Sequence, residues 1–199
     1  MRGIPFSSYS LDDPKSLVKA NIHLKGHQSG NRVPVDRALL AEISGVQHLS
    51  IPAPCLEAIS FMKVCDLPAF GHLKKLKLND WELLAINFLN VSPNLEDLGT
   101  KSDEECIELQ WNLPETVPVC LSSHLKTICI IGFKGWKFEM EAAKYLLKNG
   151  RAFKKMIIYT ANDLPSMKAN KLPKNFSCFK RPVKWNLSTC DLEVSAFRL

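Results

Sequence analysis

Two histidines near the start of the sequence have the spacing that metal binding would need. His23 and His27 are four residues apart, which on a helix would place two zinc ligands on one face. Gly26 and Gly30 weaken any helix there, and no cysteine or acid completes a recognisable motif around them. We therefore interpret the pair as exposed histidines on a strand end and loop, and expect no metal site.

A cysteine and histidine arrangement for nucleophilic catalysis is also conceivable, because Cys120 and Cys129 flank His124. We interpret both cysteines instead as small apolar side chains that pack inward beside a strand. No GxSxG, GxxxxGK[ST], GxGxxG or HExxH motif occurs in the sequence. We expect no catalytic residue, no cofactor and no enzymatic activity.

The basic residues are concentrated in one stretch. The net charge is +6, and residues 134–184 contain 13 Lys or Arg against 3 Asp or Glu, interleaved with aromatic residues. Phosphate contacts and base stacking would use this composition, so a basic nucleic-acid-binding protein is the alternative function. However, eleven of the 13 are lysines, which lack the fork of donors with which arginine reads bases, and this favours a protein partner.

The cysteines and the hydropathy of the chain indicate a compartment. The seven cysteines form no CxxC pair, and no apolar segment follows residues 1–6 as in a secretory signal. The longest apolar runs, such as residues 128–131, are far shorter than the ~20 residues of a membrane helix. We expect reduced thiols in an intracellular protein, cytoplasmic or nuclear, with no membrane partner.

The elements that must position any binding residues are predicted by an internal repeat. The clearest copy is the LxxLxL pattern of Leu73, Leu76 and Leu78; degenerate copies begin at Leu17, Val46, Leu95, Leu125 and Phe153, with starts 22 to 30 residues apart. This period fits one strand, a turn and a return segment in each turn of a solenoid. We predict six strands in one curved parallel sheet, with the apolar residues of every copy facing one core.

The return segments are predicted to differ in structure. Trp81, Leu84, Ala85 and Phe88 have helical spacing up to a stop at Ser92-Pro93, and residues 136–149 form an amphipathic helix. Prolines in the first two units leave loops or short turns. Residues 161–184, with three prolines among six Lys or Arg, are predicted to be irregular and partly mobile.

Several segments resemble a known family. VPVCL at residues 117–121, KYLLKN at 144–149 and MII at 156–158 occur in order and resemble the FBD domain at the C-terminus of plant F-box/leucine-rich-repeat proteins. SPNLEDL at residues 92–98 resembles the repeats that precede that domain. The resemblance implies an α/β leucine-rich-repeat-like solenoid with one curved parallel sheet and short helices, with degenerate repeats over residues 1–115 and an FBD domain over 116–199 that continues the solenoid and has a basic irregular tail.

The resemblance also implies a function. It indicates a non-enzymatic protein-interaction module similar to the substrate-recognition part of an F-box ubiquitin-ligase subunit. No leucine- and proline-rich helical segment of the F-box kind precedes Leu17. We therefore expect a Skp1-type adaptor as a partner only if an F-box is supplied elsewhere.

The candidate binding surface follows from the repeat. The positions between the apolar residues of each copy should lie on the open, concave face of the sheet, because side chains alternate along a strand. This face is equally well explained as the solvated side of a half-buried sheet; if it binds, its lysines suit an acidic substrate protein. The candidate partner-binding residues are Lys19, His48, Lys74, Lys75, Lys77, Glu96, Asp97, Lys126, Lys154 and Lys155.

Overall fold

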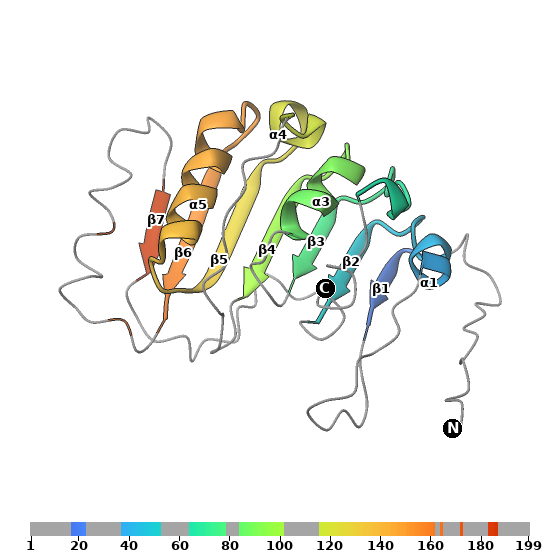
Figure 1. Cartoon of the computed structure of the whole chain (residues 1–199), viewed down its shortest axis with the longest axis horizontal. Helices are drawn as coiled ribbons and strands as arrows, with labels where there is room; N and C mark the ends of the chain where they lie inside the picture. Colours follow the sequence, from blue (N-terminus) through green and yellow to red (C-terminus); the bar gives the residue numbers. More distant parts are fainter. Residues whose placement is uncertain are drawn as a thin grey trace, which may run out of the picture.

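The computed structural model describes residues 17–22, 37–52, 64–78, 84–101, 116–161, 164, 172 and 183–186 of the 199-residue chain. Its centre is a single parallel sheet in which the strands lie side by side in chain order (Figure 1). The predicted single parallel sheet is confirmed. The strands are β1 (Lys19–Asn21), β2 (His48–Ile51), β3 (Lys75–Leu78), β4 (Asp97–Lys101), β5 (Thr127–Phe133), β6 (Lys155–Thr160) and β7 (Val183–Asn186).

Short helices connect the strands and lie along the same side of the sheet (Figure 1). Their order along the chain is α1 (Arg37–Glu42), the 3-10 helix η2 (Val64–Asp66), α3 (Leu84–Val91), α4 (Val119–Ser123) and α5 (Lys137–Asn149). Right-handed parallel connections require such a layer on the face over which the chain returns. The opposite face of the sheet carries the alternate side chains of every strand.

The register of the strands follows the repeat. The middle apolar positions of the six copies pair from strand to strand, in the order Ala20, Leu49, Leu76, Leu98, Ile128 and Met156. All six are buried and belong to one hydrophobic core, together with apolar residues of α1, α3, α4 and α5. The inward direction of the repeat residues is thereby confirmed.

The sequence predictions for the longer helices agree with the structure where it can be compared. The helix predicted at residues 136–149 is α5, which begins one residue later, at Lys137. Helix α3 ends at Val91, directly before Ser92-Pro93 as predicted. Trp81, the first residue of the predicted helical spacing, lies outside the described residues.

Three features differ from the prediction. In the first unit, predicted to hold loops or short turns, the structure has helix α1, which starts after Pro34 and buries Leu40 completely. In the stretch predicted to be irregular, Val183 and Lys184 belong to β7, which pairs with β6 as a seventh parallel strand. A strand is favoured there because Val183 and Trp185 are good strand formers at alternate positions, and Pro182 precedes the strand, where its missing N–H is tolerated.

The third difference also lies in the stretch predicted to be irregular and partly mobile. Leu172 is buried and packs against Gly135, in the turn between β5 and α5. A Cβ atom at position 135 would lie 2.8 Å from Leu172 Cδ2, and Gly135 has a φ of +71°. Both facts require glycine at this turn.

Candidate functional site

The starts of the strands share one backbone pattern. In four successive repeats, two consecutive amide groups donate to a single carbonyl of the preceding repeat: Lys74 and Lys75 to Gln47, Glu96 and Asp97 to Lys74, Lys126 and Thr127 to Glu96, and Lys154 and Lys155 to Lys126, with N···O distances of 2.8 to 3.2 Å. His48 and Gln47 donate in the same way to Val18. Two consecutive residues that face one partner residue interrupt the strict alternation of side chains, as at a β-bulge.

This pattern brings two rows of side chains to the open face. The first row holds the residue directly after the first apolar residue of each copy, and the second row holds the next residue. We call the surface that carries these rows, opposite the helices, the candidate face. The first row is Val18, Gln47, Lys74, Glu96, Lys126 and Lys154, and the second row is Lys19, His48, Lys75, Asp97, Thr127 and Lys155.

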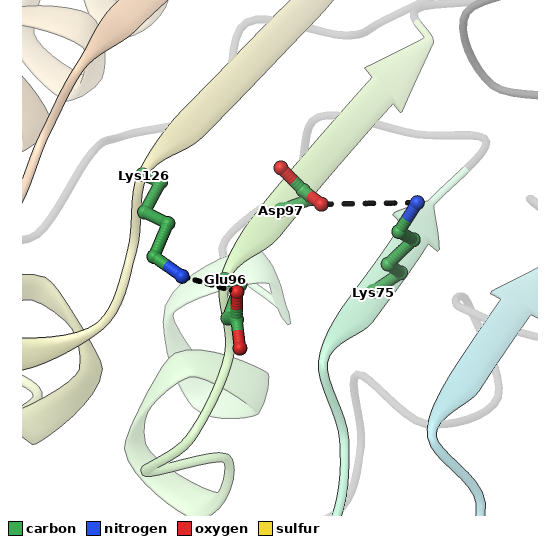
Figure 2. A network of polar contacts seen from close by, with 4 residues as sticks. All are labelled: Lys75, Glu96, Asp97 and Lys126. Carbon is green, nitrogen blue, oxygen red and sulfur yellow. Dashed lines mark hydrogen bonds and ion pairs between the residues drawn. The ribbon is translucent and has the colours of Figure 1, made fainter.

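Ion pairs link neighbouring strands within both rows (Figure 2). In the first row, Lys126 Nζ lies 2.5 Å from Glu96 Oε2, and in the second row Lys75 Nζ lies 3.9 Å from Asp97 Oδ2. The hydrogen bond from Lys126 lowers the pKa of the Glu96 carboxyl below its ordinary value. Both acids of the candidate face are therefore occupied by lysines of the adjacent strands.

The other lysines of the two rows are exposed. Lys19, Lys74, Lys154 and Lys155 make no ion pair with any acid among the described residues, whereas each acid of the candidate face has a lysine partner. The charge of Lys74 lowers the pKa of both His48 and Glu96.

His48 lies in the second row between two lysines. It pairs with Lys19 in β1 and with Lys75 in β3. Burial, and then the charges of Lys75 and Lys19, hold the pKa of its imidazole below the ordinary value of 6.5. The ring is therefore neutral at pH 7, and its Nδ1 has no hydrogen-bond partner in the described part of the chain.

A third row lies two residues further along the strands. Lys77 of β3 and Lys184 of β7 belong to it, at positions that register through Gly99, Cys129 and Ile157. Cys129 is almost completely buried and Ile157 is half-buried. The centre of this row is therefore apolar and largely buried, with a lysine on each side of it.

The structure places each candidate residue from the sequence on this surface. Lys19, His48, Lys75, Asp97 and Lys155 register directly across the sheet, Lys74, Glu96, Lys126 and Lys154 precede them by one residue, and Lys77 lies in the third row. Sequence analysis missed the two ion pairs and the position of Lys184. The signal for the ion pairs was present in the alignment of the repeat copies, where Glu96 falls opposite Lys126 and Asp97 opposite Lys75.

Cys120 and His124 have separate hydrogen-bond partners. The Cys120 thiol donates to the carbonyl of Leu89 at 3.3 Å, and burial raises its pKa to about 12. His124 is exposed, and its Nδ1 lies 2.7 Å from Ser123 Oγ. Cys120 packs inward as predicted, whereas Cys129, also predicted to pack inward, is buried but lies by register in the third row of the candidate face.

The described residues contain no group of three or more His, Cys, Asp or Glu side chains that could hold a metal ion. No helix among them has the length and apolar character needed to cross a bilayer. His23 and His27, the pair with zinc spacing, lie outside the described residues.

Comparison with known proteins relates the chain to one group. Residues 113–158 match the FBD family model, a range that includes α4, β5, α5 and the start of β6. An F-box/FBD/LRR-repeat protein of Arabidopsis thaliana is 34% identical over 132 residues, covering 61% of this chain and 30% of the relative. An FBD-associated F-box protein of the same plant is 29% identical over 157 residues, covering 75% of this chain and 34% of the relative.

A third relative agrees with these two. A putative F-box/FBD/LRR-repeat protein of Arabidopsis thaliana is 32% identical over 125 residues, covering 60% of this chain and 26% of the relative. The chain thus spans about a third of the length of the curated relatives that it matches. No solved structure matches it. Residues 113–158 are thus similar to the FBD family, and the chain is similar to plant F-box/FBD/LRR-repeat proteins.

Proposed function

We propose that the protein is a non-enzymatic interaction module that recognises a substrate protein as part of an F-box ubiquitin ligase, and that the candidate face is the recognition surface. The observation that carries this proposal is the alignment of exposed lysines in register across the sheet, in a chain related to F-box/FBD/LRR-repeat proteins. Solenoid sheets present extended surfaces of this kind to partners.

The charge of the surface suggests the class of partner. Its two acids are paired with Lys126 and Lys75, so the face as a whole is positive. An acidic partner would be attracted over a distance of about one Debye length and oriented on the face. We therefore propose an acidic substrate protein.

The connection to a ligase depends on an F-box. The related proteins are named for an F-box together with an FBD or LRR region, and we propose that the present region acts beside an F-box in the same way. A Skp1-type adaptor would bind that F-box, and the candidate face would remain free for the substrate. The division of residues 1–115 and 116–199 into repeats and an FBD domain is part of the same proposal.

A charge-reversal experiment tests the surface. We expect the double variant Lys75→Glu/Lys155→Glu to lose a protein that the unaltered chain retains from plant extract, as quantified by mass spectrometry. The matched control is Lys144→Glu/Lys148→Glu, which changes the net charge equally at two exposed positions of α5 and should retain that protein. Equal retention by both double variants would remove the candidate face from the proposal.

The second candidate function, nucleic-acid binding by residues 134–184, is disfavoured by where its lysines lie. Lys137, Lys144 and Lys148 are exposed on α5, whereas Lys155 and Lys184 belong to the open side of the sheet. The basic stretch is thus divided between two sides of the sheet. Binding of random DNA near physiological salt, with an affinity that decreases steeply as salt is raised, would favour this alternative.

A further inference from the structure

We propose that the candidate face binds an extended peptide with two acidic clusters whose starts are about four residues apart; this inference rests on the proposed function and specifies its partner. It follows from how the charges are distributed across the strands. Apart from Lys19 in β1, the positive charge is concentrated at two places on the sheet, and the surface between them is neutralised by its own ion pairs.

The first place is the start of β3. Lys74 and Lys75 are exposed there, and Lys77 lies two residues further along the same face. Lys75 lies 3.9 Å from Asp97 with half of its side chain exposed, an arrangement that leaves its ammonium group available to a second carboxylate. We call these three residues the β3 cluster.

The second place is the start of β6. Lys154 and Lys155 are both exposed, and their amides donate to Lys126 O in the pattern shared by the other strand starts. Lys184 of β7 lies beside this strand, in register with Ile157. We call Lys154 and Lys155 the β6 cluster.

The surface between the clusters belongs to β4 and β5. Its first row holds the Glu96 and Lys126 ion pair, and its second row holds Asp97, which Lys75 reaches, and Thr127. Figure 2 shows the four charged residues bridging three adjacent strands. This central zone presents no unpaired positive charge among its described residues and would repel additional carboxylates placed over Glu96.

The distance between the clusters sets the spacing in the ligand. Lys75 and Lys155 lie in one row across β3, β4, β5 and β6, which is three strand spacings of about 4.8 Å, or roughly 14 Å. An extended peptide advances about 3.3 Å per residue. A peptide that crosses the strands therefore reaches from one cluster to the other in about four residues.

The same geometry favours a peptide over a nucleic acid. Duplex DNA carries one negative charge per roughly 1.7 Å of its axis, so it would place phosphates over Glu96 and Asp97 as well as over the lysines. A peptide can place neutral residues over this central zone and carboxylates on either side. Glu96 and Asp97 would thus repel a ligand whose negative charge is uniformly distributed.

The test uses synthetic peptides of identical composition and net charge. One peptide carries two Glu-Glu pairs whose first members are four residues apart; its isomers carry the same four glutamates contiguously or with the pairs eight residues apart. Affinities are measured by fluorescence anisotropy at physiological ionic strength. We expect the four-residue spacing to bind about tenfold more tightly than either isomer, because only it engages both clusters at once.

Variants assign the effect to the two clusters. Neutralising either the β3 cluster (Lys74→Ala/Lys77→Ala) or the β6 cluster (Lys154→Ala/Lys155→Ala) should abolish the preference for the four-residue spacing. The control Lys144→Ala/Lys148→Ala on α5 should preserve it. A circular-dichroism melt of each variant verifies the fold, which these exposed and half-buried positions are expected to leave intact.

The outcomes separate this inference from the proposed function. Equal affinity of the three isomers, no measurable affinity of any, or tighter binding of single-stranded DNA of equal charge would overturn the two-cluster ligand. If the reversal of Lys75 and Lys155 still removes the protein retained from extract, the candidate face stands with a different ligand. If that reversal changes nothing while the isomers do differ, the peptide site stands and the proposed substrate surface fails.

Discussion

Glu139 is a carboxylic acid buried beneath the first turn of α5, with 1% of the residue exposed. Its Oε2 accepts hydrogen bonds from the backbone amides of Trp136 at 2.9 Å and Lys134 at 3.1 Å. It therefore closes the turn between β5 and α5 as well as capping the helix. We expect Glu139→Ala to lower the free energy of unfolding by about 2 kcal/mol, because two partly buried amides lose their acceptor, as measured by urea denaturation.

The ionisation of Glu139 predicts a dependence of stability on pH. Burial raises the pKa of its carboxyl to about 7 from an ordinary value of 4.5, although the backbone amides and Lys134 act in the opposite direction. Between these values the folded protein holds a proton that the unfolded chain has released. The contribution of this group to stability is therefore complete below pH 4.5 and is lost as the pH rises through 7, by at most about 3 kcal/mol.

The variant Glu139→Gln isolates this contribution. Its side chain keeps an oxygen that can accept the amide hydrogen bonds but cannot ionise. In urea denaturation, the unfolding free energy of the variant minus that of the unaltered protein should be more positive at pH 7.5 than at pH 5. The same difference between the two proteins at both pH values would contradict the raised pKa.

At this scale the sequence predicts residue types better than their partners. It places Glu96 and Asp97 among the lysines of the candidate face, but it does not show that Lys126 and Lys75 reach them. That depends on strand register and on the shared carbonyl at each strand start, both of which are long-range. Glu139 could be predicted only as an acid in an early helical turn, because its burial depends on the packing of α5 on the sheet.

At the scale of elements, the register of the sheet depends on the middle apolar residue of each repeat. Leu76 is 1% exposed between Leu49 and Leu98. Leu76→Ala should cost about 2 to 5 kcal/mol of unfolding free energy, measured in urea. Lys74→Ala, at an exposed position of the same repeat, should change it by less than about 0.5 kcal/mol; similar losses in both variants would argue against this register.

The turn after β5 provides a second test. Gly135→Ala combines a left-handed backbone with a Cβ that would lie 2.8 Å from Leu172 Cδ2, and we expect it to cost about 1 to 3 kcal/mol in thermal or urea unfolding. Gly71→Ala is the matched control, since nothing lies within 4 Å of its added Cβ. Should the two variants be equally stable, the contact between Leu172 and Gly135 would not contribute to the fold.

The repeat pattern explains which strands and helices the sequence predicted and which it missed. Six strands were predicted because their copies begin with an apolar residue at the expected spacing. The seventh was missed because the equivalent first position before Val183 is Lys180, so the pattern is incomplete there although Val183 and Trp185 remain. Helix α1 was missed because its six residues are too few for a helical period to stand out.

At the scale of the whole molecule, each described strand pairs with its neighbours in chain order, so stability should vary along the solenoid. In β1 only Ala20 is buried, whereas in β5 Ile128, Cys129, Ile130 and Phe133 are buried. We expect the amides of β1 to exchange with deuterium at least about 100-fold faster than those of β5 in a dilute monomer. Equal protection of both strands would show that stability does not vary in this way.

Because one carbonyl is shared at each strand start, the distance between successive starts does not depend on the number of residues between them. The repeats begin 22 to 30 residues apart, yet successive starts are joined by the same pair of hydrogen bonds and lie one strand spacing apart. Residues inserted into or removed from a connection on the helical side would therefore leave the spacing of the charges on the opposite side unchanged. The connections on the helical side can therefore change in length and sequence, by evolution or by design, while the distances between the charged side chains of the candidate face stay the same.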